Sequence, residues 1–342
     1  MTLELGLDTF GDVTNGPDGT PLPHAQVLRN LVDQAVLADQ VGLDFIGIGE
    51  HHREDFAVSA PEVVLAAIAS KTERIHLGSA VTVLSSDDPI RVFQRFSTLD
   101  ALSNGRAEVI LGRGSFTESF PLFGLNLGDY EKLFEEKLEL FAAVRKQNPV
   151  NWTGTVRPPV EGKSVYPPVE NGLLKTWIGV GGSPESVVRT ARYGLSLTLA
   201  IIGGEPARFA PYVDLFHRAL TQFEFAQQPI GVHSPGYIAE TDAQAREELW
   251  PNYFATISRI GRERGWSPPT RESFEHEADV GSLYVGSPDT VAAKIAATAK
   301  TLGLSRFDLK YSNGPLSHEQ MMSSIGLYGE QVAPKVSALL AE

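Results

Sequence analysis

Two adjacent histidines beside a glutamate are the residues with the clearest capacity for chemistry. Gly49, Glu50, His51 and His52 follow a short apolar segment that begins at residue 45. An imidazole can exchange a proton near neutral pH or bind a metal ion, and a nearby carboxylate can orient it. The clustering of these groups at the end of a predicted strand favours a functional role.

Two alternatives to acid–base chemistry are open for this cluster. Neighbouring residues of a strand point to opposite sides, so His51 and His52 do not easily share one metal ion. A metal site would need a third ligand from another strand end, but His76 lies early in its predicted strand and His233 lies mid-strand. In the structural alternative, one histidine caps a helix or pairs with Glu50.

A second group of residues has the makings of a phosphate site. A glycine turn ending in Gly182 leads into a predicted helix, with Ser183 as N-cap and Pro184 at the first helical position. Free N–H groups and the positive end of the helix dipole favour anions there. Ser183 and Ser186 can add hydroxyl donors, and Arg113, between two glycines after another predicted strand, can add positive charge. An ordinary capped helix and a surface ion pair are the alternatives.

Small residues mark places where another group can approach the backbone. Gly78, Ser79 and Ala80 follow one another in a predicted buried strand, and Gly203 and Gly204 follow a later strand. These positions leave room for a ligand close to the chain, although the pattern alone is not specific.

The elements that must position these residues alternate between strand and helix. Eight strands, each followed by a helical stretch, predict right-handed βαβ units, a parallel sheet and a closed (β/α)8 barrel in one domain, 1–342. An open sheet is the alternative, but no GxGxxG follows the first strand. The strands are predicted at 3–10, 45–50, 75–84, 107–112, 176–180, 196–202, 229–240 and 307–311. The helices are predicted at 24–41, 61–71, 89–102, 130–146, 184–193, 205–225, 242–264, 287–302 and 318–340.

Two long stretches break this rhythm. Residues 147–175 hold five prolines and several glycines, and residues 265–284 are also irregular. Both are predicted to be insertions that build a substrate pocket at the C-terminal face of the barrel, where barrel enzymes carry their active sites.

Composition excludes several classes of protein. The net charge of −13 and a pI of 5.1 disfavour nonspecific nucleic-acid or anionic-membrane binding, which needs a basic face. The sequence has no cysteine, so disulfides and cysteine-ligated metal sites are excluded. We find no signal peptide and no apolar run of roughly 18 residues, so we expect a cytoplasmic protein.

Taken together, five segments resemble the bacterial-luciferase-like, flavin-dependent monooxygenases, in the right order and nearly end to end. They are GIGEHH, IHLGSAVTVLSSDDPIRV, STLDALSNGRAEVILGRGSF, WIGVGGSPESVVRTARYGL and VGSPDTVAAKIAATAKTLGLSRFDLKYSNG. The resemblance implies a (β/α)8 barrel that binds reduced FMN at its C-terminal face.

The resemblance also implies roles for individual residues. Arg113, Gly182, Ser183 and Ser186 would hold the FMN phosphate, and Ala80 and Val81 would form a non-prolyl cis peptide beneath the flavin ring. His51 matches the active-site histidine, with Glu50 beside it in the motif. Luciferases carry a reactive cysteine where this chain has Gly112, so light emission is not expected.

The implied reaction uses FMNH2 and O2. One oxygen atom enters an organic substrate and the other leaves as water, while a separate NAD(P)H:flavin reductase supplies the reduced flavin. A homodimer that packs through 61–71 and 89–102 is expected. Three alternatives stay open: F420-dependent hydride transfer on the same barrel, a non-catalytic flavin-binding barrel, and a metal-dependent hydrolase.

Overall fold

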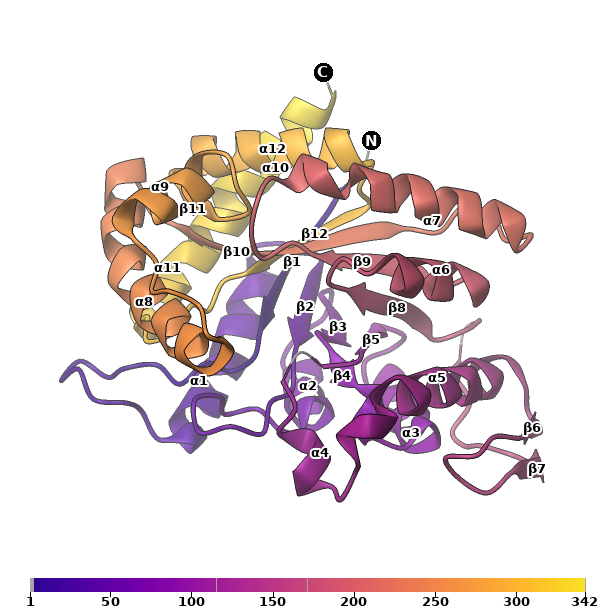
Figure 1. The fold of residues 1–342 in the computed structure, drawn as a ribbon. Coiled ribbons are helices and arrows are strands. Elements are labelled where there is room, and N and C mark those ends of the chain that lie inside the picture. Colours follow the sequence, from indigo (N-terminus) through magenta and orange to yellow (C-terminus); the bar gives the residue numbers. More distant parts are fainter. Residues whose placement is uncertain (1–2, 115, 171, 342) are drawn as a thin grey trace.

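The computed structural model describes residues 3–114, 116–170 and 172–341. In this part of the chain, eight parallel strands close into a barrel, because β1 pairs with both β2 and β12, and β10 joins β9 to β12 (Figure 1). The predicted (β/α)8 barrel is confirmed. The strands are β1 (Glu4–Thr9), β2 (Phe45–Ile48), β3 (His76–Ser79), β5 (Ala107–Gly112), β8 (Lys175–Val180), β9 (Ser196–Ala200), β10 (Ile230–Ile238) and β12 (Arg306–Lys310).

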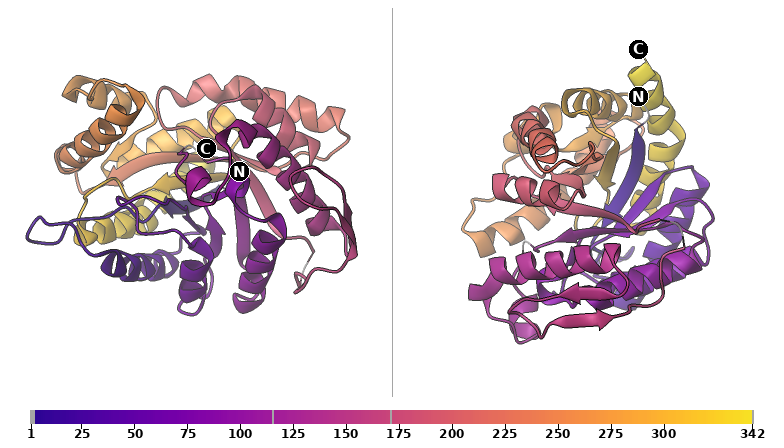
Figure 2. Two further views of the ribbon diagram at one scale, coloured as in Figure 1. Left: turned by 60° about the horizontal axis from the view of Figure 1, so that its bottom comes forward. Right: turned by 90° about the vertical axis from the view of Figure 1, so that its right-hand side faces the viewer.

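Helices surround the strands in both views of Figure 2. Several begin as their sequences predict: α3 has Asp88 as N-cap, α10 has Ser287, and both have proline in the first turn. The outer helices are α1 (His24–Gln40), α2 (Pro61–Ala69), α3 (Pro89–Leu102), α5 (Tyr130–Lys146), α6 (Pro184–Arg192), α7 (Ala210–Gln222), α10 (Pro288–Leu302), α11 (His318–Leu327) and α12 (Ala333–Ala341). None of the helices described is long and apolar enough to cross a membrane.

The third predicted strand, 75–84, is broken in the structure. β3 ends at Ser79, the Ala80–Val81 peptide bond is cis, and the short strand β4 (Thr82–Val83) pairs with β5. The break places Ala80 and Val81 at the C-terminal end of the barrel, where the resemblance predicts this cis bond.

The helix predicted at 242–264 has the right bounds but does not pack as the barrel helix that follows β10. This helix is α8 (Asp242–Arg264). Its first residue, Asp242, accepts hydrogen bonds from Ser287 and Thr290 at the beginning of α10. Its end forms ion pairs with the loop after β2 through Arg259 and Glu263. Since both ends meet loops at the C-terminal face, α8 lies across that face. The stretch 265–284, predicted as irregular, contains α9 (Arg271–Asp279) and leads into β11 (Tyr284–Gly286).

The other predicted insertion, 147–175, packs on the outside of the barrel and reaches the start of α3, where Arg157 pairs with Asp88. It contains an antiparallel hairpin of β6 (Val150–Trp152) and β7 (Val160–Lys163), which runs alongside α5 (Figures 1 and 2). Glu136 of α5 accepts hydrogen bonds from Thr155 and Val156, and a cavity of about 550 Å³ lies between α5 and the hairpin. The segment enters from a helix and leaves into the start of β8, so it connects at the N-terminal end of the barrel. The expectation that it lines a substrate pocket stays a prediction.

Side chains fill the barrel interior at the N-terminal ends of the strands. Glu108 and Arg306 are 0% and 1% exposed and form a two-point ion pair, with nitrogen–oxygen distances of 2.8 and 3.0 Å. Trp177 donates its indole N–H to the same carboxylate at 2.9 Å, and Phe45 and Ile110 pack nearby. Burial alone would raise the pKa of Glu108, but the Arg306 charge holds it well below its usual range. With the interior filled there, a ligand can only enter at the C-terminal end.

Candidate active site

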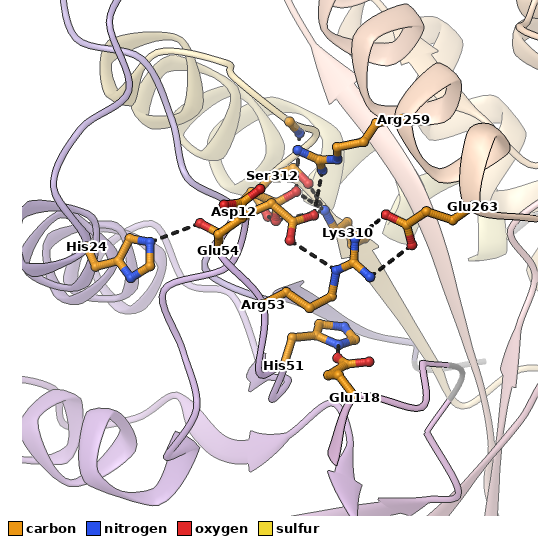
Figure 3. Close-up of polar contacts among 12 residues, drawn as sticks. Asp12, His24, His51, Arg53, Glu54, Glu118, Arg259, Glu263, Lys310 and Ser312 are labelled. Carbon is orange, nitrogen blue, oxygen red and sulfur yellow. Dashed lines mark hydrogen bonds and ion pairs between the residues drawn. The ribbon is translucent and has the colours of Figure 1, made fainter. Parts of the chain in front are cut away.

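His51 lies at the C-terminal end of the barrel, in the loop that joins β2 to α2. Its backbone N–H donates to the carbonyl of Val58 at 3.0 Å, which fixes the start of the loop. Its side chain is 11% exposed, and Nδ1 lies 3.4 Å from Oε1 of Glu118 (Figure 3). Burial acts to raise the pKa of Glu118, but the hydrogen bond to His51 and other hydrogen bonds bring it below its ordinary value. The pair can hold or move one proton.

Aromatic rings enclose His51. The ring centroids of Phe10, Phe56 and Phe116 lie 4.9, 4.5 and 5.0 Å from that of the imidazole. These contacts restrict the orientation of His51 and keep water away from three sides of the ring.

Glu50 and His52 form a separate pair, with Oε1 and Nε2 3.6 Å apart. The neighbouring Glu50 raises the pKa of His52 above its ordinary value. His51 and His52 thus face different carboxylates, although β2 ends at Ile48 and both histidines lie in the loop that follows it. No group of three histidine or acidic side chains among the described residues is arranged to hold a metal ion.

Ala80 and Val81 are packed against glycines of the neighbouring strands. A Cβ atom at Gly49 would lie 2.5 Å from the carbonyl oxygen of Ala80, and one at Gly112 would lie 2.5 Å from a Val81 methyl group. At Gly179 the corresponding distance to Val81 is 3.0 Å. Glycine at these positions therefore lets the Ala80–Val81 segment sit inside the strand ends, between β5 and β8.

The N-terminus of α6 has the predicted cap. The Ser183 hydroxyl accepts a hydrogen bond from the backbone N–H of Ser186 at 3.3 Å, and Pro184 occupies the first turn. A Cβ atom at Gly181 would meet no heavy atom within 4 Å, and Gly182 has φ of +108°, which favours glycine. The backbone before the helix is thus open to a ligand.

Arg113 reaches the same region from the end of β5. Its guanidinium forms an ion pair with Glu131 at the start of α5 and lies 5.5 Å from the ring centroid of Tyr130. The pKa of Glu185, beside Ser183, is lowered first by its own backbone N–H and the Ser183 hydroxyl, and further by the charges of Arg113 and Arg189. The structure therefore brings Arg113 near the cap of α6. The acidic side chains of Glu131 and Glu185 lie in the same region.

Sequence reasoning missed the groups that tie the loops together over the strand ends. Arg53 donates to both carboxylate oxygens of Glu263 on α8, at 2.9 and 2.5 Å, and also to Asp55 (Figure 3). Its guanidinium lies 4.7 Å from the ring centroid of Phe116. These partners are up to 210 positions apart, and nothing in the local pattern pairs them.

Two further polar groups in the barrel were also missed. Lys310 of β12 donates to both oxygens of Asp12 at 2.9 Å, and Ser312 donates to Asp12 at 2.6 Å (Figure 3). Asp8 of β1 and His233 of β10 form a direct contact through Oδ2 and Nδ1. In sequence, only the charged or polar residues within otherwise buried strands signal these groups.

Comparison with known proteins decides the family. Residues 9–306 match the model of the luciferase-like monooxygenases. The chain belongs to the luciferase-like monooxygenase family. An N-acetyl-S-alkylcysteine monooxygenase of Bacillus subtilis is 32% identical over 189 residues, which cover 53% of each protein.

Solved structures of this family share the barrel. The oxygenating constituent of 3,6-diketocamphane monooxygenase from Pseudomonas putida, a type II Baeyer–Villiger monooxygenase in complex with FMN, superposes with a TM-score of 0.79 at 18% identity, covering 98% of this chain and 99% of that chain. An F420-dependent secondary alcohol dehydrogenase gives 0.74 at 16% identity, with coverage of 98% and 99%. At these identities the two structures establish the fold alone, and the family model supports an oxidoreductase of the monooxygenase type.

Proposed function

We propose that this protein is an FMNH2-dependent monooxygenase that acts on a small organic substrate with O2. The observation that carries the proposal is the position of Val81. Its side chain lies against Gly112 and Gly179, so it stands between the ends of β5 and β8. These two strands lead directly into Arg113 and the capped turn of α6, so the Val81 side chain and the anion site are neighbours.

The residues present fit FMN. Gly182, Ser183, Ser186 and Arg113 would hold the phosphate, since open backbone, two hydroxyl groups and a guanidinium converge near the N-terminus of a nine-residue helix. The Ser183 hydroxyl, which donates to Glu185 at 2.8 Å, would turn to the phosphate. Ala80 and Val81 would contact the ring system. When bound, the reduced flavin supplies the electrons that activate O2.

The chain's own residues would hold protons and exclude water. His51 and Glu118, whose side chains are 11% and 21% exposed, would hold a proton between them. The three phenylalanine rings described above surround His51. Glu50 orients His52 beside this pair. The Arg53–Glu263 contact holds α8 over the strand ends, which restricts the entry of water.

F420-dependent hydride transfer is the second candidate, supported by the shared barrel of the alcohol dehydrogenase. The acidic side chains Glu131 and Glu185 favour FMN over F420. F420 continues beyond its phosphate into carboxylates, which these glutamates would repel.

We also propose a separate NAD(P)H:flavin reductase, a homodimer and a cytoplasmic location. The exposed apolar side chains Val63 of α2 and Leu102 of α3, 71% and 65% accessible, support a dimer through these helices. Light scattering of the purified protein measures its oligomeric state. Activity with and without an added flavin reductase measures the dependence on reduced flavin.

The test is ¹⁸O2 incorporation into a panel of thioethers, aldehydes and cyclic ketones, with a free reductase supplying FMNH2. We expect one labelled oxygen atom in a product. His51→Ala should bind FMN as the wild type does but lose oxygenation by roughly 100-fold or more, whereas His217→Ala, exposed on α7, should be unchanged. Unchanged turnover in His51→Ala would remove His51 from the reaction, and a product that forms only with F420 would replace the proposal.

A further inference from the structure

A second histidine–carboxylate pair lies inside the barrel at its C-terminal end. Asp8 of β1 is 1% exposed and His233 of β10 is 14% exposed by side chain, and Oδ2 of Asp8 contacts Nδ1 of His233. The function proposed above does not use this pair. Both residues belong to strands, so the pair is held by the barrel itself rather than by a loop.

The contact sets the orientation of the imidazole. A carboxylate only accepts hydrogen bonds, so Nδ1 carries the hydrogen toward Asp8 and Nε2 keeps its lone pair. In the part of the chain that the structure describes, no side chain or backbone group hydrogen-bonds Nε2. A histidine oriented in this way is built to accept a proton.

The pair belongs to the same end of the barrel as His51. The ring of Phe10 is stacked on that of His233, with centroids 6.1 Å apart and planes 25° apart. The same Phe10 ring meets His51 edge-on at 4.9 Å. His51 and His233 therefore both lie next to one phenylalanine.

The surroundings of His233 contain other buried carboxyl oxygens without partners. Asp308 stands opposite His233 in the strand register and is 1% exposed, and neither of its oxygens has a hydrogen-bond partner among the described residues. Oδ1 of Asp8 also has none. Burial raises the pKa of Asp308 well above its ordinary value. Polar atoms of this kind are costly to bury unless they serve water or a ligand.

We propose that His233, oriented by Asp8, is a second catalytic residue that accepts a proton through Nε2 from an O–H or N–H group of the substrate. The inference rests on the proposed function, because the substrate is that of the monooxygenase reaction. In the step, the O–H or N–H bond breaks, its electron pair stays on the substrate, and the proton forms an Nε2–H bond. Asp8, as the positioning residue, stabilises the imidazolium. The substrate class is thus a molecule with a weakly acidic hydroxyl or amide beside the oxidised atom.

Two isosteric variants separate this role from a structural one. His233→Asn keeps an amide N–H at the position of Nδ1, so it preserves the contact with Asp8 but removes Nε2. Asp8→Asn places an amide at this contact; when its N–H donates to Nδ1, the hydrogen moves to Nε2 and the ring cannot accept a proton there. Ser234→Ala is the matched control, because Ser234 is the next residue on β10 and its hydroxyl donates to the Ile201 carbonyl.

The first readout needs no turnover. ¹⁵N NMR of histidine-labelled full-length protein should show His233 with hydrogen on Nδ1 in the wild type and on Nε2 in Asp8→Asn. A wild-type ring with hydrogen on Nε2 would overturn the proposal, whatever the cofactor is.

The second readout uses the substrate found with ¹⁸O2 and its analogue methylated at the O–H or N–H group. We expect kcat to fall by roughly 100-fold or more in both isosteric variants, with FMN binding changed less than twofold, and the preference for the unmethylated substrate to disappear. Unchanged kcat, or an equal loss of FMN binding, would refute a catalytic role for His233. If the wild type oxygenates nothing, the proposed function fails, and the NMR result still decides how Asp8 orients the ring.

Discussion

The ion pair between Arg113 and Glu131 makes a quantitative prediction about flavin binding. Arg113 already has a carboxylate partner, so a phosphate at the α6 N-terminus must compete with Glu131 for the guanidinium. Replacing Arg113 by alanine should weaken FMN binding, and replacing Glu131 by glutamine should strengthen it.

The magnitude follows from the geometry. A hydrogen bond to a charged group contributes about 1.5–3 kcal/mol. The Arg113 side chain is 28% exposed and must give up Glu131, which is 62% exposed, so we take the lower end. Arg113→Ala should therefore raise the Kd for FMN about tenfold. An exposed ion pair contributes about 0.2–1 kcal/mol, so Glu131→Gln should lower the Kd by a factor of roughly 1.4 to 5.

Quenching of FMN fluorescence gives the Kd of each variant, including the double variant Arg113→Ala/Glu131→Gln. Most of the gain from Glu131→Gln should disappear when Arg113 is absent, because the two residues are coupled. Arg192→Ala is the control, since Arg192 lies in the last turn of α6 and pairs with Glu135. A Kd that changes less than twofold in Arg113→Ala, or weaker binding in Glu131→Gln, would refute this account of the phosphate site.

Three further predictions concern the framework of the site. Glu108→Gln should lower the free energy of unfolding by about 3 kcal/mol, measured with urea, because it leaves the buried Arg306 with only the partly exposed Glu4 as a carboxylate partner. Since the pKa of Glu108 is depressed, the wild type should lose this contribution as pH falls through that pKa. Glu50→Gln should lower the pKa of His52 in an NMR titration, and an unchanged titration would contradict the pairing. The stability that this pair contributes should be complete below the ordinary histidine pKa and lost as pH rises through the raised pKa of His52. Arg53→Ala should increase amide hydrogen exchange at the end of α8 without lowering protection in the barrel strands, and equal protection would show that the ion pair does not hold the helix.

Local signals in the sequence were sufficient for the elements and for one part of the site. The Ser183–Pro184 sequence predicted the cap of α6 because capping depends only on residues within one turn. The helix bounds of α8 were equally local, but its place across the C-terminal face depends on contacts of Asp242, Arg259 and Glu263 with distant loops. Periodicity marks amphipathic helices and cannot say which of two successive helices packs on the barrel.

The polar pairs show the same limit. Asp8 and His233 are 225 positions apart and meet only because the barrel closes. Glu118, 67 positions from His51, is brought to it by the loop after β5. The break of the third strand at Ala80 was also invisible in its apolar pattern, and only the family resemblance indicated it.

The most direct test of the central claim is a titration of the purified protein with FMN, anaerobic FMNH2 and F420, followed by calorimetry. The account predicts that FMNH2 binds and that Arg113→Ala and Ser183→Ala weaken its binding. Binding of F420 without either form of FMN would contradict the proposed oxygen chemistry while keeping the barrel. If none of the three bound, the assignment of the C-terminal face to a flavin would be wrong.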